Sequence, residues 1–217
     1  MRKSISSVIF IGSVWGMVEA TVGHFLHVFT LGIGWLLWFP IAFFFLTSVY
    51  RMTQKTSCML YTAVIAAGIK MIDIFYTPRY DYVINPAVSI LLEALAVLAI
   101  YTYLLNKYQN VKLDFITILL ASAGWKVLYI CYLLFLPDSW ISISCLSGLI
   151  PFVKFIFLET VMNTLLICLT MFAARRAATI KIKTFSRFEK LFNNHSILVP
   201  LFSLLTLILA VFVQINL

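Results

Sequence analysis

Charged residues are scarce in this chain, and their scarcity decides its class. Asp, Glu, Lys and Arg make up 11% of the 217 residues, hydrophobic residues make up 63%, and the mean hydropathy is +1.03. So little polar surface cannot cover a soluble globule of this length. The sequence therefore predicts an all-α fold, a polytopic helix bundle embedded in a membrane.

Cysteine is sparse as well, and its spacing argues against cross-links and metal sites. Four cysteines are spread over the chain without a CxxC pair: Cys58, Cys131, Cys145 and Cys168. Neither a disulfide framework nor a zinc site is indicated. His24 and His27 stand three residues apart without a cysteine or a further histidine nearby, so we interpret them as lining or interfacial residues. We expect no metal and no cofactor.

Enzyme signatures are mostly missing. The sequence contains no HExxH, DDxxD, GxSxG, Walker or CxxCH motif. We therefore expect a protein without enzymatic activity, with one alternative left open: a membrane-embedded enzyme that uses Glu19 and His24 for acid–base work on a lipid or prenyl substrate. The net charge of +8 does not indicate a nucleic-acid partner, because the basic residues fall in short segments between apolar runs.

Apolar runs of close to twenty residues predict seven membrane-spanning helices. Thr77-Pro78 ends the third helix, Asn85-Pro86 starts the fourth with a first-turn proline, and Pro137 ends the fifth. The expected spans are residues 8–27, 32–50, 58–76, 85–105, 114–136, 146–173 and 197–216.

These spans divide the chain into three parts. Residues 1–175 form a six-helix core with an outward-facing polar cavity, and residues 197–217 form a C-terminal transmembrane helix. Residues 176–196 mix basic and aromatic side chains in a spacing that suits a helix lying in the headgroup layer. We expect membrane lipids to be the partner of this basic segment.

Lysine and arginine indicate the orientation of the helices. With the N-terminus inside the cell, Arg79 alone falls outside, whereas twelve basic residues fall inside: Arg2, Lys3, Arg51, Lys55, Lys107, Lys112, Arg175, Arg176, Lys181, Lys183, Arg187 and Lys190. Seven spans then place the C-terminus outside. We expect this topology in a bacterial cytoplasmic membrane.

Ionisable residues inside the predicted spans form the candidate site. A charge in hydrocarbon costs several kcal/mol unless it is paired or hydrated, so each marks a functional position by default. A rise of about 1.5 Å per residue places them all in the outer half of the membrane. We expect one solute-binding cavity lined by His24, Asn163 and the seven ionisable residues Glu19, Lys70, Asp73, Glu93, Lys126, Lys154 and Glu159. The alternative is that these residues form ion pairs that only fix helix packing, such as Lys70 with Asp73 at i, i+3.

Small residues recur along the first predicted helix. Gly12, Gly16 and Ala20 form a small-xxx-small stripe that permits close approach of another helix. Two interpretations remain open. The stripe packs against a neighbouring helix of the same chain, or it is a docking face for a partner subunit.

The stripe, the six short helices with both ends inside and the polar pocket in the outer half resemble the substrate-binding subunits (S components) of energy-coupling factor vitamin transporters. The resemblance covers residues 1–175 and implies capture of a vitamin-like solute and docking onto a membrane scaffold driven by ATPases. This chain differs in its seventh helix, its short connection between helices one and two, and its larger number of intramembrane charges. The competing architecture is an autonomous seven-helix carrier built as three plus one plus three helices. We therefore predict a membrane transport component that captures a small polar solute from the outer side.

The charge bias generates a testable topology. A reporter fused after Leu217 is expected outside the membrane, and one inserted in the 106–113 loop is expected inside. Protease protection of both fusions measures their sides. The reverse pattern would invert the placement of the candidate cavity.

Overall fold

The computed structural model describes residues 2–28, 34–76, 78–109, 113–137, 145–179 and 198–216, and within these ranges the chain forms helices and no strand. The helices in chain order are α1 (Arg2–Val28), α2 (Gly34–Thr53), α3 (Ser57–Lys70), η1 (Met71–Phe75), α4 (Asp81–Tyr108), α5 (Phe115–Leu133), α7 (Leu149–Val153), η2 (Lys154–Leu158), α8 (Glu159–Thr179) and α10 (Leu198–Asn216). Six helical segments are long and apolar enough to cross a membrane, and α10 contributes a shorter apolar helix. The predicted all-helical membrane bundle is confirmed.

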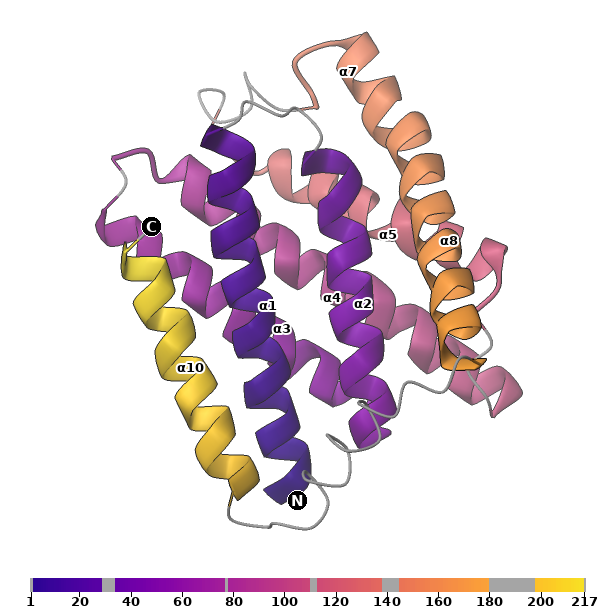
Figure 1. Cartoon of the computed structure of the whole chain (residues 1–217). Coiled ribbons are helices and arrows are strands. Elements are labelled where there is room, and N and C mark those ends of the chain that lie inside the picture. The colour runs from indigo at the N-terminus through magenta and orange to yellow at the C-terminus, as the bar shows by residue number, and fades with distance from the viewer. Residues whose placement is uncertain are drawn as a thin grey trace.

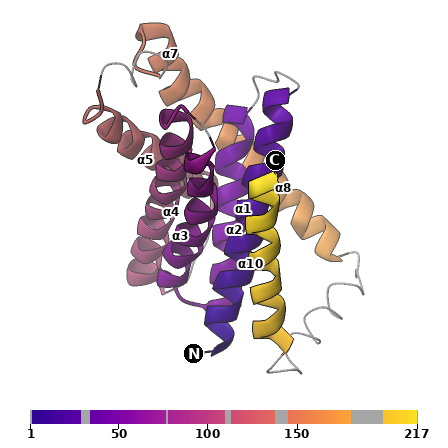
Figure 2. The ribbon, with the colours of Figure 1, turned by 90° about the vertical axis from the view of Figure 1, so that its left-hand side faces the viewer.

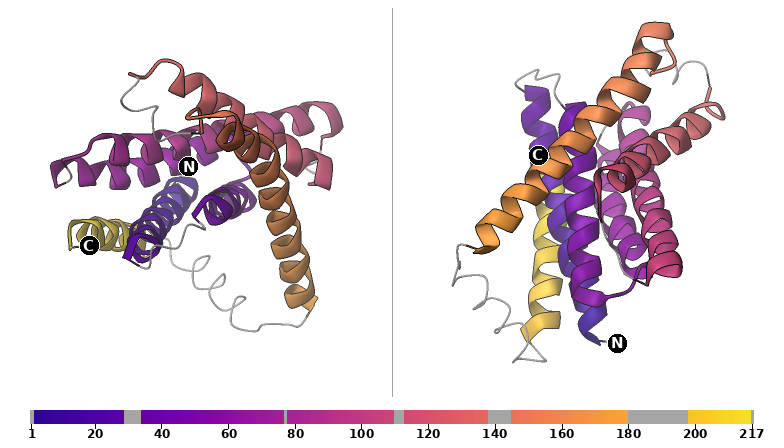
Figure 3. Two further views of the ribbon diagram at one scale, coloured as in Figure 1. Left: turned by 90° about the horizontal axis from the view of Figure 1, so that it is seen from above. Right: turned by 90° about the vertical axis from the view of Figure 1, so that its right-hand side faces the viewer.

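Two layers of helices make up most of the bundle. Helices α1, α2 and α10 form one layer, and α3, α4 and α5 form the other (Figure 1, Figure 2). Across the layers, α1 packs on α3, and α2 contacts both α3 and α4. Helix α8 closes one edge because it packs on both α5 and α2 (Figure 3). The interior therefore lies between the layers and beside α8.

The start of α5 follows from its local sequence. Asp114 is the N-cap residue, and its carboxylate accepts hydrogen bonds from the backbone N–H and the hydroxyl of Thr117. These bonds hold the pKa of the Asp114 carboxyl below its ordinary value. Its stabilising contribution is therefore present above the ordinary Asp pKa and is lost as the pH falls through the lowered folded-state pKa.

Helix α4 begins earlier than predicted. It starts at Asp81, so Pro86 lies inside the helix and the prediction of a first-turn proline is wrong. An ion pair of 2.6 Å between Arg79 and Asp81 and a backbone bond from Ile84 N–H to the Tyr80 carbonyl form an extra turn ahead of the proline. A polar, self-paired turn at the membrane surface thus lengthens the helix beyond its apolar run.

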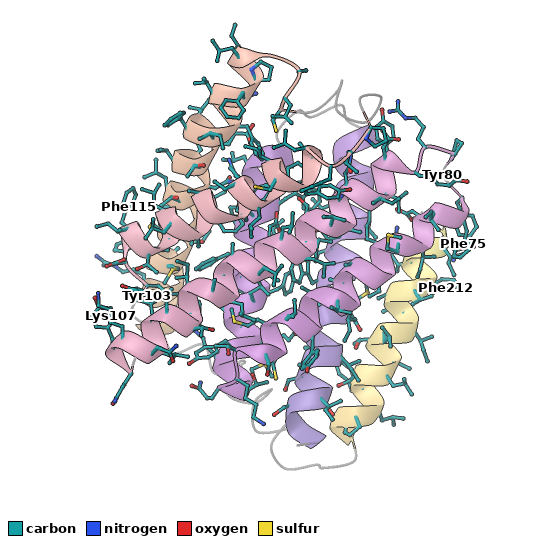
Figure 4. The ribbon with its side chains drawn as sticks, turned by 180° about the vertical axis from the view of Figure 1, so that it is seen from behind. Phe75, Tyr80, Tyr103, Lys107, Phe115 and Phe212 are labelled. Carbon is teal, nitrogen blue, oxygen red and sulfur yellow. The ribbon has the colours of Figure 1, made fainter. Side chains whose placement is uncertain are left out.

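Aromatic side chains mark both ends of the bundle. Figure 4 shows Phe75, Tyr80 and Phe212 at one end and Tyr103 and Phe115 at the other. All five side chains are exposed. Exposed aromatic residues at two opposite ends are typical of the two water interfaces of a membrane protein.

The small-residue stripe of α1 packs inside the chain. A Cβ added at Gly12 would lie 2.9 Å from both Ile65 Cβ and the Thr62 carbonyl oxygen, and one added at Gly16 would lie 2.6 Å from Ile69. All three members of the stripe are buried: Gly12, Gly16 and Ala20. Of the two interpretations, close packing within the chain is therefore the one that the structure shows. Gly12 and Gly16 therefore contact α3 of the same chain, and docking of a partner subunit through the stripe stays a prediction.

Helix α10 belongs to the bundle. It lies along α1, where the Ser203 hydroxyl donates to the Ser6 carbonyl at 2.9 Å (Figure 1). Near the end of α10, the Gln214 amide donates to the carboxylate of Asp73 in η1. The seventh helix thus joins the predicted six-helix core through both layers.

Parts of three predictions fall outside the described residues. Residues 180–197, which contain most of the predicted basic surface segment, are not described, and neither is the break between the first two helices at 29–33. The side chains of His24 and His27 also lie outside the description. These parts of the three interpretations stay predictions from the sequence.

From the close contact between α1 and α3 we predict different stability changes when alanine replaces two helical glycines. Gly12→Ala should destabilise the protein by about 1 to 3 kcal/mol, because neither Ile65 Cβ nor the Thr62 carbonyl can rotate away from the new methyl group. The matched control is Gly68→Ala on α3, where nothing lies within 4 Å of an added Cβ and alanine favours the helix. Thermal unfolding in detergent compares the two. Equal unfolding midpoints would contradict the tight packing.

Candidate functional site

Four ionisable side chains converge in the interior of the bundle. They come from α1, α4, α5 and α8, and none is more than 9% exposed: Glu19, Glu93, Lys126 and Glu159. Lys126 and Glu159 form an ion pair at 3.5 Å, whereas Glu93 is within electrostatic range of Glu19 and Lys126 without a hydrogen bond or an ion pair to either. The structure therefore brings together four of the residues that the sequence singles out, across the two layers and α8.

Lys126 is the most enclosed of the four, with an exposed fraction of 0%. Its Nζ donates to the Phe155 carbonyl oxygen at 2.7 Å and lies 3.5 Å from the Glu159 carboxylate. The ammonium group also lies 4.7 Å from the centroid of the Phe155 ring and 5.7 Å from that of Trp125. A carboxylate, a carbonyl and two rings thus replace water around a buried cation, which is what burial of an ammonium requires.

The helical segment that leads into Glu159 contains a π-helical turn, which is wider than an α-helical turn. The sequence predicts a single helix over 146–173, but the structure inserts the π-helical turn η2, in which the Glu159 N–H bonds to the Lys154 carbonyl. Phe155, whose carbonyl accepts the hydrogen bond from Lys126 Nζ, belongs to the same turn. Single π turns in long helices occur frequently at functional sites.

Glu19 is oriented by an aromatic neighbour. The Trp15 Nε1 donates to the Glu19 carboxylate at 3.1 Å, and the Trp15 ring stacks on Phe45 with centroids 6.0 Å apart. Lys70 interacts with Glu19 electrostatically, but its Nζ contacts Asp73 at 2.7 Å instead. Within the described part of the chain, Glu19 therefore has one hydrogen bond and no ion pair.

The predicted pair of Lys70 and Asp73 is confirmed. It joins the end of α3 to η1, and both side chains are about one-fifth exposed. Gln214 of α10 donates a hydrogen bond to the same Asp73 carboxylate, so a third helix also contacts this pair. The Lys70 ammonium therefore already forms an ion pair with Asp73 at this end of the bundle.

Glu93 is the least compensated group. It is 3% exposed, yet among the described residues no donor hydrogen-bonds its carboxylate and no cation forms an ion pair with it. Its interactions are electrostatic: repulsion by Glu19 and attraction by Lys126. A buried carboxyl group without a contacting partner is costly in its charged form, and either a proton or a bound cation would remove that cost.

Aromatic rings enclose the Lys126 side of the cluster. Trp125 stacks on Phe39 with centroids 5.7 Å apart and meets Phe155 edge to face at the same separation. Tyr129 packs on both Trp125 and Phe155. The Trp125 Nε1 is buried without a hydrogen-bond partner among the described residues. The wall beside the charges thus contains an indole N–H without a described partner.

The other predicted site residues separate into three groups. Asn163 is fully buried one turn beyond Glu159, on the face that the sequence predicts. Lys154 is exposed and so is not one of the enclosed charges. His24 lies on α1, but its side chain is outside the description.

Several contributors to the site escaped the sequence argument. Trp15 stands four residues before Glu19, a spacing that predicts contact on a helix, so that hydrogen bond had a readable signal. The Phe155 carbonyl and the Gln214 amide had none. A backbone carbonyl becomes available only where the helix widens, and Gln214 meets Asp73 across 141 residues of chain.

Comparison of this chain with family models, with curated proteins and with solved structures finds no match. Its function is therefore argued from the site alone.

The described site contains more acid than base. Among the described residues, no three Cys, His, Asp or Glu side chains gather as metal ligands. Lys126 neutralises Glu159, and Lys70 neutralises Asp73, which leaves Glu19 and Glu93 without a contacting cation. Such an arrangement can accept a proton or a positively charged group from a ligand.

The enclosed pair predicts a large response to removal of one partner. Lys126→Met should cost about 3 to 5 kcal/mol of stability, because it leaves the Glu159 carboxylate without its cation in a dry interior. The exposed pair of Arg79 and Asp81 is the control, and Arg79→Met should change stability little because water screens that pair. Unfolding midpoints in detergent compare the two.

A double variant refines this prediction. Lys126→Met combined with Glu159→Gln should recover much of the lost stability, since no charge then remains unpaired. Equal losses in Lys126→Met and Arg79→Met would show that the enclosed contact is not a significant ion pair.

Proposed function

We propose that this protein is a membrane transport component that binds a small polar solute from the outer side and passes it inward. The observation behind the proposal is the Glu93 carboxylate, which is buried and has no contacting partner within the described residues. Uncompensated carboxylates in membrane interiors are associated with solute and ion pathways and with proton relays.

A purely structural role explains Lys126 better than it explains Glu93. Lys126 and Glu159 satisfy one another and connect α5 to α8, as an ion pair that fixes packing would. Glu93 connects nothing, although its burial lowers the stability of the bundle. A ligand that forms a hydrogen bond or an ion pair with Glu93 would explain why a carboxyl group is buried at this position.

The place of the cluster also supports transport. Glu19 belongs to one layer, whereas Glu93 and Lys126 belong to the other. Carriers typically bind their solutes near the middle of the membrane, between two groups of helices that move relative to each other. Separation of the α1–α2 side from the α4–α5 side would open this cluster to water.

The packing of α1 favours an autonomous carrier over a subunit that docks on a scaffold. Gly12 and Gly16 of the stripe, which docking would use, already pack on α3 of the same chain. The other alternative from the sequence is an enzyme that uses Glu19 and His24. The described contact of Glu19 does not favour it, because the Glu19 carboxylate accepts a hydrogen bond from the Trp15 indole N–H.

Reconstitution tests the proposal. The purified protein should retain a small molecule that mass spectrometry identifies, and proteoliposomes containing this chain alone should accumulate that molecule. Glu93→Gln should reduce accumulation by about tenfold or more, corresponding to one lost charged contact. Asp81→Asn, which removes a partly exposed carboxylate that is paired with Arg79 at the start of α4, is the matched control and should transport normally.

Three other results would redirect the proposal. Uptake in cells without uptake in liposomes would indicate a missing scaffold subunit. Chemical conversion of an added lipid would indicate an enzyme. Neither retention nor uptake of any molecule would leave the charges with a structural role.

A further inference from the structure

We infer that the Trp125 indole N–H and the neighbouring Lys126 ammonium together bind an uncharged oxygen acceptor of the solute, the carbonyl oxygen of an amide. The inference rests on the proposed transport function and deepens it by naming the class of solute and the donors that hold it. It follows from a local excess of buried N–H groups over acceptors where α5 meets η2 and α8.

The Trp125 indole N–H is a buried donor that lacks an acceptor. Trp125 is 8% exposed, and its Nε1 has no hydrogen-bond partner among the described residues. The ring itself is held in place, because it stacks on Phe39 and meets Phe155 edge to face, each with centroids 5.7 Å apart. A buried N–H group without an acceptor opposes folding, and an acceptor atom on a ligand would remove that cost.

The Lys126 ammonium also has a hydrogen left to donate. An ammonium group carries three N–H donors, and the described residues offer this one two acceptors, the Phe155 carbonyl at 2.7 Å and the Glu159 carboxylate at 3.5 Å. The second distance exceeds the about 2.7–2.9 Å of a good charge-assisted hydrogen bond. Glu159 therefore neutralises Lys126 without using all of its hydrogen-bonding capacity.

The two donors are close enough to share one oxygen atom. Lys126 Nζ lies 5.7 Å from the centroid of the Trp125 ring, and Nε1 is an atom of that indole. Two donors that bind the same oxygen can be up to about 6 Å apart, because each N–H···O distance is about 2.7–3.2 Å. A carbonyl oxygen has two lone pairs and can accept both hydrogens. Adjacent residues of α5 thus present a pair of donors that suits one carbonyl oxygen.

The charges at this place favour an uncharged acceptor over an ion. Since Glu159 already neutralises Lys126, a carboxylate or phosphate on the same ammonium would leave one negative charge in excess in a buried position. A cationic group would bring a third donor to a place that already lacks acceptors. A carbonyl oxygen satisfies the donors and adds no charge.

The contact between α5 and α8 contains a further open polar group. The Ser122 hydroxyl, one turn before Lys126 on α5, donates to the Thr160 carbonyl at 3.3 Å, so Thr160 belongs to the same interface. The Thr160 hydroxyl is buried and has no partner among the described residues. A hydroxyl both donates and accepts, and an amide offers a donor beside its carbonyl. This second position is the reason for choosing an amide rather than a ketone.

The test uses the full chain in lipid nanodiscs and acetamide as the probe. Acetamide should raise the unfolding temperature of the wild-type protein saturably, whereas sodium acetate and methylammonium chloride, ions of similar size, should act as sodium chloride does. Trp125→Phe keeps an aromatic ring but removes the N–H, so it should weaken the apparent affinity for acetamide by about fivefold or more. Trp38→Phe removes an indole N–H from α2 instead and is the matched control, which should respond as wild type does.

The indole signals in a nuclear magnetic resonance spectrum test the contact directly. In protein that contains isotope-labelled tryptophan, the Trp125 N–H signal should move downfield as acetamide is added, because a new acceptor deshields the proton. Absence of a saturable shift in every indole signal would overturn the inference, whether or not Trp125→Phe folds, since the donor would then have another permanent partner such as an ordered water. An undiminished acetamide effect in a folded Trp125→Phe would also overturn it, and so would equal stabilisation by acetate or methylammonium.

The outcomes separate this inference from the proposed function. Uptake of an ionic solute in proteoliposomes that Trp125→Phe does not change would preserve transport and overturn the carbonyl site. Binding of acetamide that depends on Trp125, without uptake of any solute, would preserve the carbonyl site and overturn transport.

Discussion

Charge that is buried inside a helix bundle must be compensated, and the contact around Lys126 shows how this bundle meets that requirement. The Phe155 carbonyl and the Glu159 carboxylate both come from the junction of η2 and α8. A π turn leaves a carbonyl free of its usual donor four residues on, so the local unwinding and the buried ammonium satisfy one another. Because α8 also packs on α2, this contact ties both layers together at one edge.

Close packing between the layers depends on small residues rather than on a hydrophobic driving force, since lipid tails are as apolar as the helices they surround. Gly12 and Gly16 bring α1 against Ile65 and Ile69 of α3, with no space for a methyl group. This approach places Glu19, one turn beyond Gly16, at the boundary with the second layer. The same stripe that suggested a docking face thus serves to position a charged residue inside the chain.

The sequence predicted the elements and the buried charges well because both depend on local composition. The apolar runs located the spans, and the i, i+3 spacing located the pair of Lys70 and Asp73. Spacing failed where the answer depended on another helix or on the solvent boundary. Which glutamate contacts Lys126 depends on the packing of α5 on α8, and the start of α4 at Asp81 accompanies an ion pair with Arg79 rather than an apolar run. The orientation of the spans, the polar cavity and the basic segment stay predictions.

Lys126 and Glu93 are both buried, but they differ in their contacts. This difference distinguishes a residue with a packing role from a candidate binding residue more clearly than burial alone does. Both are almost completely enclosed, and both belong to the layer of α3, α4 and α5. The lysine has a carbonyl and a carboxylate as acceptors, whereas the glutamate has electrostatic interactions but no hydrogen bond or ion pair within the described bundle. A charged side chain that serves only stability would be replaced by an apolar residue without loss, since burial of an uncompensated carboxylate opposes folding. On the proposed function, a bound solute would supply the contact that Glu93 lacks within the described bundle.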